Sequence, residues 1–240
     1  MLSDFLMHDI HAPGRFDFDK QRRAITIRGW GNTEWNNAVI AAAANHLLRI
    51  VRVEWRGNIL LTDNDVIARY KALTGSIAPE DTRDVGLDVL GSLKDWRNSG
   101  WPVDTKAGIR TFKISAYGEI EPNDPVAMRV ALYALHGVQI GLQLPAAVMG
   151  NLKFWHYKGE SSAEWKPGSW GGMLVYAKAY NEDVYEIVAW GKRIAVTNEF
   201  VARYADEAWS VVGDLNDWRT RQAVDVVALS QRLNEISHAA

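Results

Sequence analysis

The chain of 240 residues contains six histidines and no cysteine, and this limits the chemistry that its side chains can perform. Without a thiol the chain has no disulfide, no thiolate metal site and no cysteine nucleophile. The histidines do not form a His-Glu-x-x-His motif or a zinc-ligand spacing, so we predict no metal site and no cofactor. They are His8, His11, His46, His136, His156 and His238.

Other residues that could take part in a reaction have simpler structural interpretations. His8 and His11 are three residues apart in a polar N-terminal segment, which favours a solvated pair. His46 lies in an apolar run and is interpreted as a hydrogen-bonded core histidine. Ser169 lies in Gly-Ser-Trp-Gly-Gly, which is not the glycine-x-serine-x-glycine elbow of a hydrolase, so we predict a turn serine.

The composition is that of an ordinary soluble protein, with 48% hydrophobic and 23% charged residues and a net charge of −2. This balance indicates neither a nucleic-acid partner nor an anionic membrane surface. The longest apolar stretches, such as 39–44 and 138–148, are far shorter than the roughly 20 residues of a membrane span. The opening four residues show no signal peptide. We expect a protein of a cytoplasm, or of an assembly made in one.

Tryptophan is abundant, with 11 copies, and the segment 150–172 contains four Trp and Tyr side chains. Such rings are favoured as interface anchors, although packing in the core is the more common role. Trp170 is expected to pack inward because Gly171 and Gly172 follow it. Trp155 and Tyr157 are then the better candidates for exposed anchors. The predicted binding residues are Trp155, Tyr157, Trp165 and Trp170.

Helices are predicted in the first half of the chain. Residues 1–28 form an irregular N-terminal arm that ends in a short extended piece. The run 38–51 is apolar on nearly all sides, which predicts a buried helix capped by Asn36 or Asn37. A second helix begins at the cap Thr62, with Asp63 and Asp65 as first-turn charges, and ends at Gly75; a third spans 87–98.

The second half of the chain reads mainly as strands. Strands are predicted at 110–120, 138–144, 173–179, 184–190, 193–197 and 208–212. Helices are predicted from Asp124 to Gly137, at 199–204 and at 220–236. The fold class is therefore α+β. Residues 29–240 are expected to form a single domain, with a helical lobe at about 36–105, a sheet-rich antiparallel lobe at about 110–212 and a C-terminal helix at about 220–236.

Between residues 30 and 236 the order and spacing of several segments resemble a family of papain-like cysteine peptidases found in bacteriophage and bacterial genomes. The resemblance implies a papain-like fold, in which helical and β-sheet lobes surround a central buried helix. The segments that carry it are 30–32, 41–46, 62–70, 87–90, 137–145 and 168–172.

The resemblance also implies that the catalytic residues of the family are absent. Ala38 stands where the family has its nucleophilic cysteine, Met173 where it has its histidine, and Val188 where it has the residue that orients the histidine. Asn32 retains a polar amide at the oxyanion-donor position. An oxyanion donor without a nucleophile or a base stabilises an intermediate that no longer forms. We therefore expect a catalytically degenerate member that is not an enzyme.

Three functions remain open. The first is a non-catalytic pseudoenzyme that acts as a structural or docking protein, most plausibly a capsid- or tail-associated component of a bacteriophage virion. Its partners would be other phage structural proteins or copies of itself, in a virion or the host cytoplasm. The second is a soluble peptide- or glycan-binding module or inhibitor that uses the active-site cleft. The third is a hydrolase of unrecognised mechanism.

Overall fold

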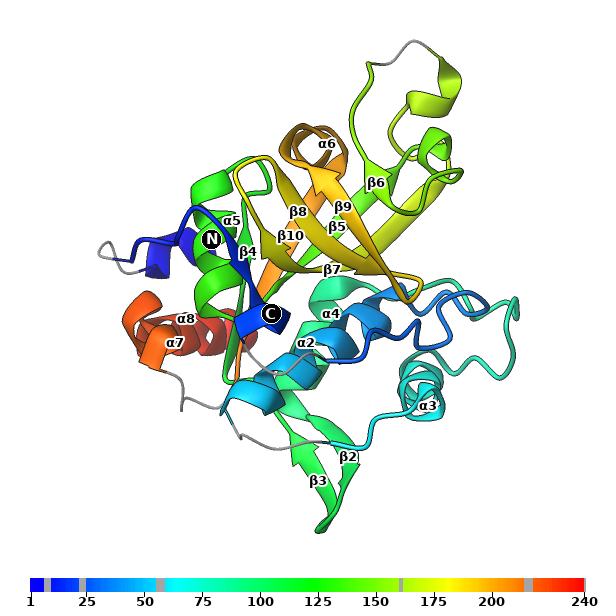
Figure 1. Cartoon of the computed structure of the whole chain (residues 1–240). Helices are drawn as coiled ribbons and strands as arrows, with labels where there is room; N and C mark the ends of the chain where they lie inside the picture. Colours follow the sequence, from blue (N-terminus) through cyan, green and yellow to red (C-terminus); the bar gives the residue numbers. More distant parts are fainter. Residues whose placement is uncertain (7–9, 22–24, 55–58, 160–161, 214–217, 240) are drawn as a thin grey trace.

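The computed structural model describes residues 1–6, 10–21, 25–54, 59–159, 162–213 and 218–239. Within these ranges, helices α2 to α4 lie beside a large twisted sheet, and further helices cover its other face (Figure 1). None of the helices in the described ranges is long and apolar enough to cross a membrane.

Helix α2 (Ala38–Glu54) is the central helix of the fold (Figure 1). Val39 to Leu47 are all buried, as the apolar run predicts. The helix begins at a cap region in which Asn37 donates from Nδ2 to the carbonyl of Trp30 at 2.8 Å and accepts the first helical bond from Ala41. The start of the helix is thereby tied to the loop that precedes it.

Two shorter helices pack beside α2, and both begin at side-chain caps. Helix α3 (Asp63–Thr74) has the predicted capping box between Thr62 and Asp65 and ends at Gly75. Helix α4 (Val89–Asn98) begins two residues later than predicted, because Asp88 accepts from the backbone N–H of Gly91 and acts as the cap.

The described residues form an eight-stranded sheet with the order β4-β10-β5-β7-β8-β9-β6, and β1 pairs with β7. Every pairing is antiparallel except that of β6 with β9. The strands are β1 (Phe16–Asp17), β4 (Ala116–Ile120), β5 (Val138–Leu144), β6 (Phe154–Trp155), β7 (Gly171–Tyr180), β8 (Val184–Ala189), β9 (Lys192–Thr197) and β10 (Ala205–Val212).

The sheet is buried on both faces, and its side chains alternate between two cores. In β7, Leu174 and Tyr176 pack on the α2 side, together with residues of α3 and α4. Met173, Val175 and Ala177 belong to the core on the opposite side, which α5 (Pro125–Ala134) and α6 (Asn198–Tyr204) cover. The strands predicted at 138–144, 173–179, 184–190 and 193–197 are confirmed, as is the mixed α+β class.

The described parts of the N-terminal arm lie against the body of the protein. They form η1 (Leu2–Phe5), β1 and α1 (Phe18–Gln21), while residues 7–9 and 22–24 of the arm lie outside the described ranges. Leu2, Phe16 and Phe18 are each at most 3% exposed. The arm is therefore part of the core, and the extended piece predicted at its end falls partly on undescribed residues.

Two predicted elements are each divided in two. The strand expected at 110–120 is interrupted, because residues up to Phe112 form a separate hairpin of β2 (Trp101–Thr105) and β3 (Gly108–Phe112). The helix expected at 220–236 consists of α7 (Trp218–Ala223) and α8 (Val226–Ala239). The break lies at Asp225, whose carboxylate caps α8 and whose N–H donates to the carbonyl of Phe5.

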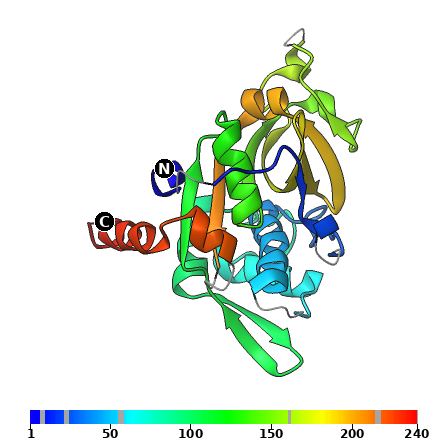
Figure 2. The same cartoon turned by 60° about the vertical axis from the view of Figure 1, so that its left-hand side comes forward.

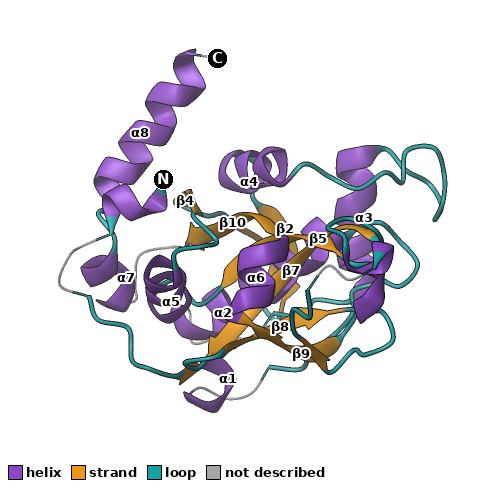
Figure 3. Cartoon of the chain, turned by 90° about the horizontal axis from the view of Figure 1, so that it is seen from above, coloured by secondary structure: helices purple, strands orange, loops and turns teal. Residues whose placement is uncertain are grey.

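The hairpin and the C-terminal helix both project from the body. Figure 2 shows the β2–β3 hairpin below the main sheet and α8 directed away from it on another side. The view from above in Figure 3 also shows α8 extending beyond the other elements. The predicted boundary between the two lobes, at about 105–110, falls within this hairpin.

Candidate active-site cleft

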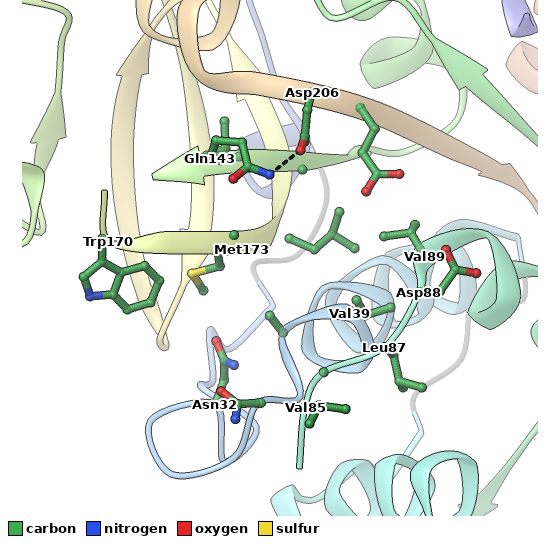
Figure 4. Close-up of a pocket in the computed structure, with 18 of the residues that line it drawn as sticks. Asn32, Val39, Val85, Leu87, Asp88, Val89, Gln143, Trp170, Met173 and Asp206 are labelled. Atoms are coloured by element: carbon green, nitrogen blue, oxygen red, sulfur yellow. Dashed lines mark hydrogen bonds between the residues drawn. The ribbon is translucent and has the colours of Figure 1, made fainter. Parts of the chain in front are cut away.

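A pocket of about 510 Å³ lies between the start of α2, the start of α4 and the ends of β5, β7 and β10 (Figure 4). Its volume falls within the roughly 300–1,000 Å³ range of small-ligand sites. The residues that line it come from positions as distant in sequence as Asn32 and Glu207. Residues that precede α2 in the sequence and residues that follow it therefore line the same pocket.

The expected nucleophile and oxyanion positions both lie at this pocket. Ala38 is the first residue of α2 and lines the pocket, as does Asn32 from the loop before the helix. Asn32 donates from Nδ2 to the carbonyl of Trp35 at 3.4 Å. The predicted placement of Ala38 at the first turn of a buried helix is confirmed.

The positions expected for the base and for its orienting residue do not face each other. Met173 lines the pocket with Ala38, but Val188 does not. Val188 pairs with Tyr176 and packs on the α2 face of the sheet, whereas Met173 belongs to the opposite core. Ala38 is expected to lie across a cleft from both Met173 and Val188. The structure brings Met173 to the pocket of Ala38, while the side chain of Val188 lies on the other face of the sheet from Met173. Ala189, the residue of β8 that follows Val188, belongs to the same core as Met173.

A tight turn between β8 and β9 closes one side of the pocket. Trp190 and Gly191 both have positive φ, of 48° and 70°, which suits a two-residue hairpin turn. A Cβ on Gly191 would lie 2.8 Å from the backbone nitrogen of Gly29. Glycine at 191 therefore permits the loop that carries Asn32 to approach the turn, and Trp190 then lines the pocket.

One wall of the pocket is acidic. Asp88, Asp206 and Glu207 line it, and none of the described residues that line it is Lys, Arg or His. Gln143 donates from Nε2 to Asp206 Oδ2 at 2.5 Å, a contact drawn in Figure 4. Trp209 donates from Nε1 to Glu207 Oε2 at 2.5 Å. These neutral donors hold the two carboxylates in place without neutralising their charge.

The acidic wall depends on a glycine of the neighbouring strand. A Cβ on Gly141 would lie 2.5 Å from Cγ of Glu207 and 2.8 Å from Oδ1 of Asp206. Only a residue without a side chain therefore allows both acidic side chains to lie across β5. Burial raises the pKa of Glu207, and the charges of Asp206 and Asp88 raise it further, while the hydrogen bond from Trp209 opposes the shift.

The aromatic segment 150–172 differs from expectation in which rings are exposed. Trp155 is fully buried because β6 pairs with β9, and its Nε1 donates to the carbonyl of Asn151 at 2.8 Å. Trp170, expected to pack inward, is 47% exposed and lines the pocket. Tyr157 is 37% exposed, and Trp165 is half-buried. Of the four predicted binding residues, the structure brings only Trp170 to the pocket.

The remaining candidate residues have structural roles. Ser169 accepts from the N–H of Ala146 and donates to the carbonyl of Glu164, as a turn serine does. His46 is fully buried, and burial lowers its pKa to about 3, so it is a neutral core residue. His8 lies outside the described residues. Within the described ranges no group of three His, Asp or Glu side chains could hold a metal ion.

No model of a protein family matches the chain, and no curated protein matches it. Solved structures do match. Xylellain, a cysteine protease from Xylella fastidiosa, aligns with a TM-score of 0.62 and 13% identity, over 84% of this chain and 87% of its own. A cysteine protease from Carica candamarcensis aligns with a TM-score of 0.59 and 13% identity, over 83% of this chain and 98% of its own.

The chain has a papain-like fold. A further match is the proform of Amb a 11, a ragweed pollen cysteine protease, with a TM-score of 0.57 and 14% identity over 86% of this chain and 69% of its own. At these identities the likeness concerns the backbone. It supports the fold predicted from the segments between residues 30 and 236.

A cysteine introduced at position 38 should remain unreactive. In Ala38→Cys the thiol would share the pocket with the thioether Met173, and none of the described residues that line this pocket is a histidine that could stabilise a thiolate. We expect no peptidase activity and a thiol pKa near the ordinary value of about 8.5. The rate of alkylation by iodoacetamide as a function of pH measures this directly, because the chain contains no other thiol.

The matched variant is Ala38→Cys/Met173→His. Since positions 38 and 173 line the same pocket, the imidazole should lower the thiol pKa by a unit or more. A low thiol pKa already present in the single variant would contradict the interpretation of position 173. An unchanged pKa in the double variant would show that the two positions are too far apart to interact.

Proposed function

We propose that this protein is a non-catalytic, papain-fold binding protein whose cleft holds a peptide segment with a basic side chain. The observation that carries the proposal is the character of the pocket wall. None of the described lining residues is Cys, Ser, Thr, Tyr, Lys or His. These side chains supply the nucleophiles of peptidases that form a covalent intermediate, so the lining supports peptide binding rather than cleavage by such a mechanism.

The charge of the wall indicates the kind of side chain that it would bind. Asp88, Asp206 and Glu207 place three carboxyl groups on the pocket, with no described cation in its lining. A guanidinium can make paired hydrogen bonds with carboxylates, and it stacks on aromatic rings. Trp170 and Trp190 meet edge to face with ring centres 5.5 Å apart, which offers a ring surface beside the same pocket.

The apolar residues at the rim of the pocket favour a peptide over an isolated cation as the ligand. Val85 is 81% exposed and lines the pocket, with Leu87 beside it. Apolar side chains at the rim and carboxylates on the wall match a segment in which a basic residue is flanked by apolar ones. The cleft would thus keep the peptide-binding use of the fold without the reaction.

The proposal is tested with two peptide libraries that differ at one fixed position, Arg or Glu, with apolar neighbours. We expect the immobilised protein to retain the Arg library selectively. In Asp206→Asn/Glu207→Gln the affinity for a retained peptide, measured by fluorescence polarisation, should fall at least about tenfold, because two charges are lost while the shape is kept. Glu199→Gln, an exposed change on α6, is the matched control and should bind normally.

The pH dependence provides a second readout. Since the pKa of Glu207 is raised above its ordinary value of 4.5, this group takes up a proton earlier than an exposed glutamate as the pH falls. Binding of an Arg peptide should therefore begin to weaken at a pH above 4.5, and Glu207→Gln should remove this part of the profile. Equal retention of both libraries, or unchanged binding by the double variant, would refute the proposal.

A narrower form of the proposal makes the protein a structural or docking component of a bacteriophage virion, with other virion subunits or its own copies as partners. Its support is the resemblance carried by the segments between residues 30 and 236, together with the non-reactive residues Ala38 and Met173. Mass spectrometry of purified phage particles tests this role, which requires the protein to be present in stoichiometric amounts.

A further inference from the structure

A buried charge cluster lies away from the cleft, where the N-terminal arm meets the sheet. At its centre is Lys178, whose side chain is fully buried. Its Nζ lies 3.1 Å from Asp17 Oδ1, 3.4 Å from Asp19 Oδ2 and 2.6 Å from Glu186 Oε1. Asp17 and Glu186 come from β1 and β8, and both pair with Ala179, which follows Lys178 in β7. Three neighbouring strands therefore bring an amine and two carboxyl groups together.

The two aspartates of the cluster have different environments. Both carboxylate oxygens of Asp19 accept from Arg49 Nη2, each at 3.1 Å, and Arg193 Nη2 lies 3.8 Å from Oδ2. Asp17 has no contact with Arg49 among the described residues. Its Oδ1 instead accepts the backbone N–H of Asp19 at 3.0 Å. A backbone donor at this oxygen is placed where it would stabilise negative charge developing on the Asp17 carboxyl group.

Glu186 is placed to carry a proton. Its Oε1 is buried and accepts no hydrogen bond of standard geometry from a described residue, although Lys178 Nζ lies 2.6 Å away. Arg193 lies farther away, with its Nε 3.9 Å from the same oxygen. A carboxylate this close to a buried amine can take up a proton from nitrogen during a reaction. The cluster thus contains a nucleophile, an electrophile, a proton carrier and a donor to the developing oxyanion.

We propose that Lys178 and Asp17 become joined by an intramolecular isopeptide bond, with Glu186 as the proton carrier. The bond would fix the N-terminal arm covalently to β7. The proposal is independent of the function of the cleft, since none of these residues lines that pocket.

The reaction balances without a further reactant. Glu186, whose Oε1 lies 2.6 Å from Lys178 Nζ, first carries one proton from this nitrogen to Oδ2 of the Asp17 carboxylate, which leaves an uncharged amine and a carboxylic acid. The lone pair of Nζ then attacks Cγ, so that the N–C bond forms and the C=O electron pair moves onto the oxygen beside the N–H of Asp19. Glu186 takes a proton from the nitrogen and delivers it to the hydroxyl group. The C–O bond breaks, one water leaves, and Glu186 returns to its initial form.

Proximity favours this step. Lys178 Nζ lies 3.1 Å from Asp17 Oδ1, so the amine is held beside the carboxyl group, and such fixed proximity raises the effective molarity of an intramolecular reaction. A second pocket, of about 610 Å³, is lined by Asp17, Lys20 and Glu186 and gives the released water a route to solvent.

Mass spectrometry of the intact, denatured protein tests the proposal. We expect the purified full-length chain to be lighter than its sequence mass by about 18 Da, one water, without any added reagent. Peptide mapping should yield a branched peptide that joins Lys178 to the segment containing Asp17. A wild-type chain that keeps its full mass after prolonged incubation in the folded state would overturn the proposal.

Four variants define the chemistry. Lys178→Arg keeps the positive charge but should keep the full mass, as should Glu186→Gln. Asp17→Asn should form the same bond with loss of about 17 Da, one ammonia, so it reports on the acceptor even if the other variants fold poorly. Asp19→Asn removes the neighbouring carboxylate but keeps the backbone donor, so the chains that fold should still lose about 18 Da. A branched peptide at residue 19 in place of 17 would overturn the assignment of the acceptor.

Discussion

Replacing Asp19 with alanine is expected to lower the free energy of unfolding by about 3–5 kcal/mol. Asp19 and Arg49 form an ion pair in which the side chains are 5% and 0% exposed. Without the carboxylate, the guanidinium of Arg49 would stay buried, and its described partners would be the carbonyl of Asn45 and the rings of Tyr176 and Phe18, none of which carries a negative charge. An uncompensated buried charge is among the costliest defects in a folded protein. Urea denaturation measures the loss.

An exposed ion pair of nearly equal length is the matched control. Arg232 and Glu235 lie 3.2 Å apart, with side chains 62% and 66% exposed. Glu235→Ala should change the free energy of unfolding by no more than about 0.5 kcal/mol, because solvent screens an exposed pair. In the double variant Asp19→Ala/Arg49→Met, stability should partly recover, since both charges leave the core together. Equal effects of Asp19→Ala and Glu235→Ala would contradict the role given to burial.

The same cluster predicts a loss of stability in acid. Burial alone would raise the pKa of Asp17, but the hydrogen bond and charge of Lys178 and the N–H groups of Asp19 and Lys20 outweigh it and lower the pKa. A carboxyl group with a depressed folded-state pKa contributes stability above its unfolded value, and this contribution is lost as the pH falls through the folded value. If the isopeptide bond forms, Asp17 no longer titrates and this part of the acid transition disappears.

The elements that could be predicted from the sequence are those fixed by local chemistry. Thr62 and Asp65 satisfy each other's backbone groups within one helical turn, so the start of α3 is determined by four residues. The burial of α2 follows from an apolar run that leaves no face suited to water. Alternation in β7 predicted the strand, although a strand in a sheet buried on both faces carries a weak pattern.

The features that could not be predicted depend on pairings between distant segments. Ser115 separates the hairpin from β4, because its N–H donates to the carbonyl of Val212 and its Oγ to that of Gly213. Nothing in residues 110–120 themselves marks this break. The acidic wall is similar, since Asp88 and Glu207 are far apart in sequence and meet only when α4 and β10 are in place.

The exposure of Trp155 and Trp170 also could not be predicted from the residues next to them in the sequence. Both lie in a segment without a long regular element, so their neighbours in sequence indicate only that they are in a loop. Pairing of β6 with β9 turns Trp155 into the core, where Trp190 and Phe200 contact it. The glycines after Trp170 belong to the start of β7, and the ring remains at the pocket rim.

Trp155→Ala is therefore expected to destabilise the fold by about 3–5 kcal/mol, the cost of removing a fully buried tryptophan. It would leave a cavity between Trp190 and Phe200 and remove the donor to the carbonyl of Asn151. For a chain of this length the melting temperature should fall by roughly 6–20 °C. Differential scanning fluorimetry measures the shift, and urea denaturation gives the free energy.

Trp170→Ala is the matched change in the same segment. It should leave the stability nearly unchanged but weaken peptide binding. Because the ring is 47% exposed, the free energy of unfolding should change by less than about 1 kcal/mol. Affinity for an Arg-containing peptide should fall several-fold, since the ring lines the pocket beside Trp190. If Trp155→Ala kept the wild-type stability while Trp170→Ala unfolded the protein, the placement of both rings would be wrong, and the contact surface would have to be sought around Trp155 and Tyr157.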